Sequence, residues 1–270
     1  MQQLRLYVCA IMKKLITFLI LLFAVSAYSG TLLQIQESII AKKRGVASCD
    51  TSNIIFWYRC ESDDFTATSG TLDYSVGDKA GTTNGGIAFN TDAVKYGTNG
   101  MDVPTGADFI YFAPISATLD DEGRLGFWVY INTWVENAEF SWIAYDDASN
   151  LAKLFMSGAD ELGLTWEDSG TERTTLVTSN ANLSTGTWYF IEVAWKTSTD
   201  LREIYVNGTE CTYSAGEGAT IASFAGDVIR TYFGETAGEN SDYYMDNIII
   251  STDSTDDLYT TCKDELEWPE

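Results

Sequence analysis

The sequence predicts an all-β chain whose strands form two packed antiparallel sheets or a barrel. From residue 54 onward, short apolar or aromatic runs with period-two alternation are separated by clusters of Gly, Asn, Asp, Ser and Thr. This pattern is typical of strands joined by turns. Only residues 34–43 have a helical texture, so parallel βαβ folds are disfavoured. A composition that is 45% hydrophobic and 13% aromatic can build a full core.

About twelve to fourteen strands are expected in all, which is too many for one open sheet. Asn207-Gly208 stands between two strand-like segments and predicts a type I′ hairpin, because both residues tolerate positive φ angles. No linker-like composition interrupts residues 50–252, so we expect one domain. The clearest strand-like runs are residues 54–59, 109–112, 125–131, 140–145, 151–156, 162–166, 187–196, 203–206, 228–233 and 243–250.

The N-terminal residues have the features of a secretory signal peptide. Arg5, Lys13 and Lys14 precede the apolar run 15–25, and Ser26-Ala27 supplies small residues for cleavage. The protein is therefore expected to be secreted or displayed at a cell surface. If the uncharged segment 15–36 is retained, it could instead anchor the chain in a membrane. The expected organisation is a signal peptide over 1–27, a leader or arm over 28–48, the folded domain over 49–252 and an acidic C-terminal tail over 253–270.

Charge and composition exclude several classes of function. The net charge of -23 repels nucleic acid and anionic lipid, so no nucleic-acid partner is expected. The chain contains no histidine, which removes Ser-His-Asp catalysis and His-ligated zinc or haem. Carboxylate chemistry, hard cations such as Ca²⁺, or binding without chemistry remain.

The cysteines predict disulfides. Loss of the signal peptide removes Cys9 and leaves Cys49, Cys60, Cys211 and Cys262, an even number in an oxidising compartment. Two disulfides are therefore expected. Cys49 with Cys262 is the favoured pair, because these residues flank the first and last strand-like runs and chain termini often lie close together.

Several segments with a recognisable order follow one another along the chain: residues 54–61, 95–101 with 108–112, 126–130, 185–195, 201–208 and 244–250. In this order they resemble the laminin-G-like, concanavalin A-like lectin/glucanase superfamily. The resemblance covers roughly residues 50–252 and implies a jelly-roll sandwich of two curved antiparallel sheets. One departure is Tyr189, which stands where the family usually has a histidine after the tryptophan of a Gly-x-Trp strand.

The superfamily that the chain resembles contains both non-catalytic adhesion modules and glycanases. Its laminarinase-like branch carries a strand with Glu-x-Asp-x-x-Glu or a one-residue-shorter version, which places two carboxylates on one face for retaining hydrolysis. No strand-like run of this sequence has that spacing. The sequence therefore favours a secreted, non-catalytic carbohydrate-binding or adhesion module, whose partner is a glycan or a glycosylated surface.

Two alternatives stay open. The first is a divergent polysaccharide-degrading enzyme that uses a carboxylate pair among Glu61, Asp146, Glu167 and Glu192. The second is a structural protein of a cell envelope or virion surface that contacts protein.

Candidate ligand-binding residues are a carboxylate and three tryptophans. Glu192 alternates with Trp188 and Phe190 on one face of its strand, where a carboxylate beside aromatic rings would suit sugar recognition. The alternative for Glu192 is a paired or edge-exposed glutamate. Trp134, Trp142 and Trp166 lie near strand ends and could form a stacking platform, against the alternative that they pack in the core.

A structural Ca²⁺ is the one cofactor considered. Asp246 lies among apolar neighbours, so its carboxylate needs a partner. In sandwiches that this chain resembles, the matching aspartate often helps to hold Ca²⁺, and Asp63 and Asp64 are the nearest further ligands. The alternatives are a hydrogen-bonded structural aspartate at 246 and a solvated acidic turn at 63–64.

Overall fold

The computed structural model describes residues 53–60, 81–104, 106–112, 119, 121–147, 150–158, 160–168, 170–215, 220–222, 230–234 and 241–262. All of them belong to the second of two compact units, Ser48–Glu270. The predicted signal peptide, the arm over 28–48, the helical segment 34–43 and the pair Asp63 and Asp64 lie outside the described residues.

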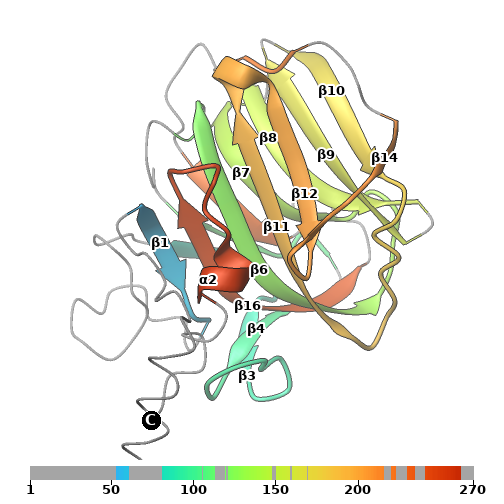
Figure 1. Ribbon diagram of the computed structural model, residues 1–270. Coiled ribbons are helices and arrows are strands. Elements are labelled where there is room, and N and C mark those ends of the chain that lie inside the picture. Colours follow the sequence, from blue (N-terminus) through green and yellow to red (C-terminus); the bar gives the residue numbers. More distant parts are fainter. Residues whose placement is uncertain are drawn as a thin grey trace, which may run out of the picture. The chain divides into compact units, whose positions relative to one another are not determined.

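The described strands form two eight-stranded sheets, and every strand pairing is antiparallel (Figure 1). Sheet A has the order β13 (Thr209–Glu210), β12 (Leu201–Val206), β11 (Trp188–Lys196), β6 (Glu122–Thr133), β16 (Asp242–Ser251), β4 (Gly100–Val103) and β3 (Ala88–Asn90), and β1 (Ile54–Tyr58) also pairs with β16. Sheet B has the order β14 (Tyr213–Ala215), β10 (Thr171–Thr178), β9 (Glu161–Asp168), β8 (Asn150–Ser157), β7 (Glu139–Asp147), β15 (Arg230–Gly234), β5 (Phe109–Phe112) and β2 (Gly81–Asn84). Two short helices, η2 (Thr197–Thr199) and α2 (Leu258–Cys262), complete the described elements.

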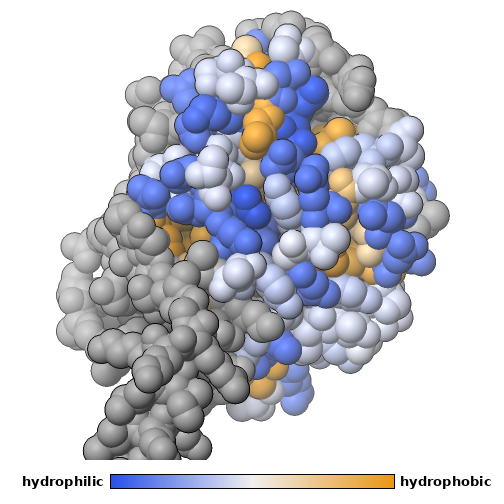
Figure 2. Space-filling view, viewed as in Figure 1, coloured by the Kyte–Doolittle hydropathy of each residue, from blue (hydrophilic) through white to orange (hydrophobic). Residues whose placement is uncertain are grey.

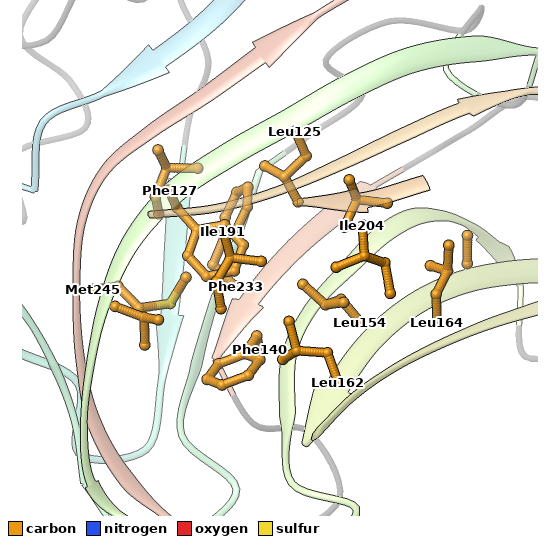
Figure 3. Close-up of a cluster of buried hydrophobic side chains, with 14 of the residues drawn as sticks. Leu125, Phe127, Phe140, Leu154, Leu162, Leu164, Ile191, Ile204, Phe233 and Met245 are labelled. Carbon is orange, nitrogen blue, oxygen red and sulfur yellow. The ribbon is translucent and has the colours of Figure 1, made fainter. Parts of the chain in front are cut away.

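The main core lies between the two sheets, as strand alternation requires. In β6, Phe127, Val129 and Ile131 are fully buried members of this core, so the residues between them point to the outer face of sheet A. Burying each such side chain contributes about 1.5–3 kcal/mol. Figure 3 shows side chains from both sheets meeting in this layer: Leu125, Phe127, Ile191, Ile204 and Met245 from sheet A, and Phe140, Leu154, Leu162, Leu164 and Phe233 from sheet B.

The predicted fold class is confirmed, and each of the ten predicted strand-like runs contains a strand. The hairpin at Asn207-Gly208 is also present, with φ of 50° and 73° and with Val206 paired to Thr209. The described residues hold sixteen strands, more than the twelve to fourteen expected. The six unpredicted strands are β2, β3, β4, β10, β13 and β14, which are short or rich in threonine and other polar residues.

The C-terminal region differs from the expected loose tail. Residues 252–262, here called the C-terminal strap, follow β16 and end in α2, which packs on the outer face of sheet A (Figure 1). Leu258 and Cys262 are each 1% exposed. The physical reason is that the few apolar residues of the strap find an apolar surface to cover. Residues 263–270 lie outside the described part.

The cysteines only partly follow the prediction. Cys60 and Cys211 are buried and form no disulfide, so the expectation of two disulfides is wrong for these residues. Cys262 is disulfide-bonded, and its partner is not among the described residues, so the pairing with Cys49 stays a prediction. Within the described part of the chain, no helix is long and apolar enough to cross a membrane.

Candidate functional site

The outer face of sheet A carries a row of three aromatic side chains on adjacent strands. Tyr244 of β16 lies opposite Tyr130 of β6, and Tyr130 lies opposite Trp188 of β11. The ring centroids of Tyr130 and Tyr244 are 5.8 Å apart with an interplanar angle of 15°, and those of Tyr130 and Trp188 are 5.5 Å apart at 54°. All three side chains are half-buried, so part of each ring faces solvent. We call this set the aromatic row.

Polar side chains flank the aromatic row on the β4 side. Asp102 lies opposite Tyr244 and accepts a hydrogen bond from Asn90 Nδ2 at 3.0 Å. Asp242 Oδ1 accepts a hydrogen bond from Asn132 Nδ2 at 3.0 Å. Burial raises the pKa of Asp102, and the nearby carboxylates of Asp242 and Asp92 raise it further, against the lowering effect of the hydrogen bond from Asn90. This end of the row therefore carries hydrogen-bond acceptors in a negative field.

The surface around the row is otherwise hydrophilic. Figure 2, which views the molecule as in Figure 1, shows mostly blue and white residues over this side, with orange confined to small patches. Tyrosine and tryptophan fall in the pale part of the scale, because they combine an apolar ring with a polar atom. Rings of this kind beside carboxylate and amide groups can stack on the CH groups of a sugar and hydrogen-bond its hydroxyls.

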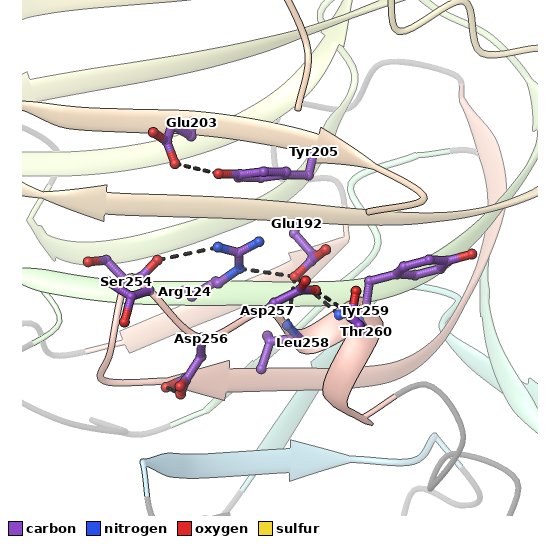
Figure 4. Close-up of polar contacts among 12 residues, drawn as sticks. Arg124, Glu192, Glu203, Tyr205, Ser254, Asp256, Asp257, Leu258, Tyr259 and Thr260 are labelled. Atoms are coloured by element: carbon purple, nitrogen blue, oxygen red, sulfur yellow. Dashed lines mark hydrogen bonds and ion pairs between the residues drawn. The ribbon is translucent and has the colours of Figure 1, made fainter. Parts of the chain in front are cut away.

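The neighbouring part of the same face is covered by the C-terminal strap. Glu192 of β11 is fully buried beneath it, and Glu192 Oε1 accepts hydrogen bonds from Leu258 N at 3.0 Å and Tyr259 N at 3.4 Å. Arg124 Nε of β6 donates to the same oxygen at 3.0 Å. Figure 4 shows Arg124 between Glu192 and Ser254, whose carbonyl oxygen accepts from Arg124 Nη1 at 3.3 Å.

The Arg124–Glu192 pair is deeply desolvated, with side chains 5% and 0% exposed. Burial raises the pKa of Glu192, and this effect outweighs the lowering by Arg124. Among the described residues, two buried polar atoms of this region have no hydrogen-bond partner: Glu192 Oε2 and Trp128 Nε1. Buried polar atoms without partners are uncommon in folded proteins, so these two atoms distinguish the covered region from the rest of the outer face.

The structure does not bring the predicted ligand-binding residues together. Trp166 is a core residue of sheet B, 1% exposed, with Nε1 bonded to the carbonyl of Ala222 at 3.0 Å. Trp134 follows β6 and packs half-buried against the main core. The backbone of Trp142 lies in β7, opposite Tyr232 and Lys153. Glu192 lies on sheet A, apart from Trp142 and Trp166 on sheet B, and the burial of Trp166 in the core removes it from the predicted stacking platform.

Asp246 is a buried structural aspartate whose carboxylate is hydrogen-bonded by protein groups. Its Oδ2 accepts from the backbone N–H groups of Lys95 and Tyr96, both at 2.8 Å, and its Oδ1 accepts from Asn247 Nδ2 at 3.1 Å. The residue is fully buried, so these donors satisfy its carboxylate. In the described part of the chain, no three His, Cys, Asp or Glu side chains gather in a way that could hold a metal ion.

Sequence reasoning missed Tyr130, Tyr244 and Asp102. The signal for the two tyrosines was present, because each lies between core positions of a predicted strand and must point outward. Tyr130 stands between Val129 and Ile131, and Tyr244 between Tyr243 and Met245. Asp102 could not be found in this way, since its strand β4 was not predicted.

The two stacked antiparallel sheets define the class of protein as a jelly-roll β-sandwich. A family model for the concanavalin A-like lectin/glucanases superfamily matches residues 104–249, so the chain belongs to this superfamily. The comparison with curated proteins found no match.

Solved structures with the same fold include toxin binding domains. The receptor binding domain of botulinum neurotoxin C/D mosaic serotype is 14% identical, with a TM-score of 0.57, covering 80% of this chain and 51% of that chain. The binding domain of Paraclostridial Mosquitocidal Protein 1 is 14% identical, with a TM-score of 0.58, covering 79% and 52%. The binding domain of botulinum neurotoxin DC in complex with SialylT is 14% identical, with a TM-score of 0.58, covering 81% and 52%. The chain spans about half the length of these structures, and the likeness shows the fold alone.

Proposed function

We propose that the protein is an exported, non-catalytic module that binds carbohydrate through the aromatic row. The observation that carries the proposal is the cross-strand set Tyr244, Tyr130 and Trp188, with partly exposed rings and with Asp102 at one end. Membership of a superfamily that includes lectins supports it, as does the complex of one structural neighbour with SialylT. Export is proposed from the signal-like residues 1–27.

Neutral glycans are the favoured ligands. The chain has a net charge of -23, and the carboxylates of Asp102 and Asp242 lie beside the row. An acidic polysaccharide would be repelled by this field unless Ca²⁺ bridged the two. A structural Ca²⁺ held by Asp246 with Asp63 and Asp64 also stays part of the proposal, so binding should be measured with Ca²⁺ and with a chelator.

A glycanase mechanism is less well supported by the described carboxylates. Glu192 is fully buried beneath the strap and paired with Arg124, so no substrate reaches it in this conformation. Glu61 lies outside the described residues. Asp146 and Glu167 lie on sheet B, on β7 and β9, which are separated by β8. An envelope or virion protein that contacts protein is the remaining alternative, and fractionation would test it.

Affinity electrophoresis of residues 28–270 through gels that contain individual polysaccharides tests the proposal. We expect retardation by at least one neutral polysaccharide without release of reducing ends, and loss of that retardation in Trp188→Ala and Tyr130→Ala. Tyr111→Ala is the matched control, because Tyr111 is a half-buried tyrosine on the outer face of sheet B. Equal retardation of all four proteins, or no retardation by any polymer, would contradict the proposal.

A further inference from the structure

We infer that the surface under the C-terminal strap is a second carbohydrate subsite, continuous with the aromatic row, which the chain's own residues Leu258 and Tyr259 occupy in this structure. The subsite consists of Trp128, Phe190 and Glu192. This inference rests on the proposed function, because the expected ligand is the same neutral glycan.

The first argument is that the aromatic surface continues beneath the strap. Trp128 and Phe190 are opposite each other on β6 and β11, with ring centroids 5.3 Å apart. Each lies two residues from a member of the aromatic row on the same strand and the same face, Trp128 beside Tyr130 and Phe190 beside Trp188. The exposed and covered rings therefore form one aromatic surface on two neighbouring strands.

The second argument comes from the polar atoms that the strap leaves without partners. Trp128 Nε1 is a donor and Glu192 Oε2 is an acceptor, and neither has a hydrogen-bond partner among the described residues. Burying such groups without partners costs free energy. A sugar carries hydroxyl groups that both donate and accept, so it could satisfy both atoms where the strap satisfies neither.

The third argument is that the strap's contacts are of the kind that a sugar would make. The N–H groups of Leu258 and Tyr259 donate to Glu192 Oε1 (Figure 4). The ring centroid of Tyr259 lies 5.8 Å from that of Phe190 and 6.5 Å from that of Trp128. Sugar hydroxyls could replace the two N–H donors, and a sugar ring could replace the aromatic contact. The displacement therefore exchanges similar interactions, which allows the ligand to compete with the strap.

The strap is also held on both sides of Leu258 and Tyr259. Towards β16, Ser254 Oγ donates to Glu122 Oε1 at 2.7 Å, and Thr252 N donates to the carbonyl oxygen of Asn53 at 3.0 Å. At the other end, Cys262 is disulfide-bonded and 1% exposed. Displacing Leu258 and Tyr259 leaves these contacts in place, so the opening is confined to the short segment between Ser254 and Cys262.

The test uses the full mature chain and a neutral polysaccharide that the wild type binds. Leu258→Ala/Tyr259→Ala should open the subsite and tighten binding by about threefold to tenfold, the range that one added aromatic contact contributes. Trp128→Phe in that background keeps an aromatic ring but removes the indole N–H donor, so the affinity should fall again by part of the increase. Leu201→Ala, a half-buried leucine outside the strap, is the control and should not change affinity.

Amide hydrogen exchange of the wild type provides a second test that needs no variant. A saturating oligosaccharide should speed exchange at the amides of Leu258 and Tyr259, because the ligand displaces them from Glu192. Unchanged or slower exchange at both amides, or a folded double variant that binds no more tightly than the wild type, would overturn the inference. Neither result would affect the proposed function, which fails only if the wild type binds no glycan or if Trp188→Ala binds as well as the wild type.

Discussion

Tyr130 and Trp188 are directly opposed residues of β6 and β11, and their ring centroids lie 5.5 Å apart on the outer face of sheet A. Tyr244 continues this contact on the other side of Tyr130. Because adjacent strands hold the rings, their spacing is set by the sheet rather than by a loop, and the surface is formed before any ligand arrives. A rigid site of this kind avoids the entropic cost of ordering side chains on binding.

The aromatic row should show graded losses of affinity. Trp188→Ala removes one ring and should weaken binding to a neutral oligosaccharide by about threefold to tenfold, whereas Trp188→Phe should lose less because a ring remains. Isothermal titration calorimetry measures both. An alanine variant that binds as tightly as the phenylalanine variant would show that the ring does not contact the ligand.

Removing one partner of the Arg124–Glu192 ion pair should destabilise the fold more than removing both partners. Arg124→Met leaves Glu192 buried without its charge partner and should lower the free energy of unfolding by about 3 kcal/mol. Arg124→Met/Glu192→Leu removes both charges and should recover most of that loss. Urea denaturation measures the difference, and Arg202→Met is the control, because its pair with Asp200 is more exposed and should cost about 1 kcal/mol or less. A double variant as unstable as Arg124→Met would contradict this account.

Stability should depend on pH through Glu192. Burial raises the pKa of Glu192 above its ordinary value of 4.5, so the folded state binds this proton more tightly than the unfolded state. The contribution of Glu192 to the free energy of unfolding therefore falls as the pH rises from 4.5 through the raised pKa of the folded state. Relative to Glu192→Gln, which does not titrate, the wild type should be more stable at the acidic end of this window than at the alkaline end. A difference between the two proteins that does not vary with pH would contradict the prediction.

Cys60 and Cys211 should be unreactive towards alkylating reagents in the folded protein. Burial raises the pKa of Cys211 to about 11, with further contributions from Glu161 and Glu210, so little thiolate is present near neutral pH. Cys60 is also buried. Alkylation with iodoacetamide, read by mass spectrometry, should label both residues in urea and neither in buffer. Rapid labelling of Cys211 in the native protein would show that the thiol is accessible.

The strongly alternating strands could be predicted from the sequence, and the polar ones could not. Residues 125–131 place apolar side chains at every second position, so their period is clear. β10, by contrast, reads Thr-Glu-Arg-Thr-Thr-Leu-Val-Thr and has little apolar periodicity. Its position is fixed by pairing with β9 and β14, and such long-range contacts are not visible in a local pattern.

The site was predictable only in part for a similar reason. The sequence places Glu192 on the same face as Trp188 and Phe190, which the structure bears out. It could not say which face of β11 is the core, because aromatic residues occur on both: Trp188 and Phe190 on one side, Tyr189 and Trp195 on the other. The covering of Glu192 by α2 also escapes a local pattern, since residues 252–262 are mostly polar.

The pairing of β1 with β16 has a consequence for how the domain can be built into larger proteins. Thr252 N donates to the carbonyl oxygen of Asn53 at 3.0 Å, and Ile54 pairs with Ser251, so the first and last strands of the sandwich bring their outer ends together. A domain whose first and last strands are paired at one edge can be inserted into a surface loop of a host protein with little distortion. The C-terminal strap continues from residue 252 and packs back on sheet A, so such a fusion has to keep residues 252–262 with the domain.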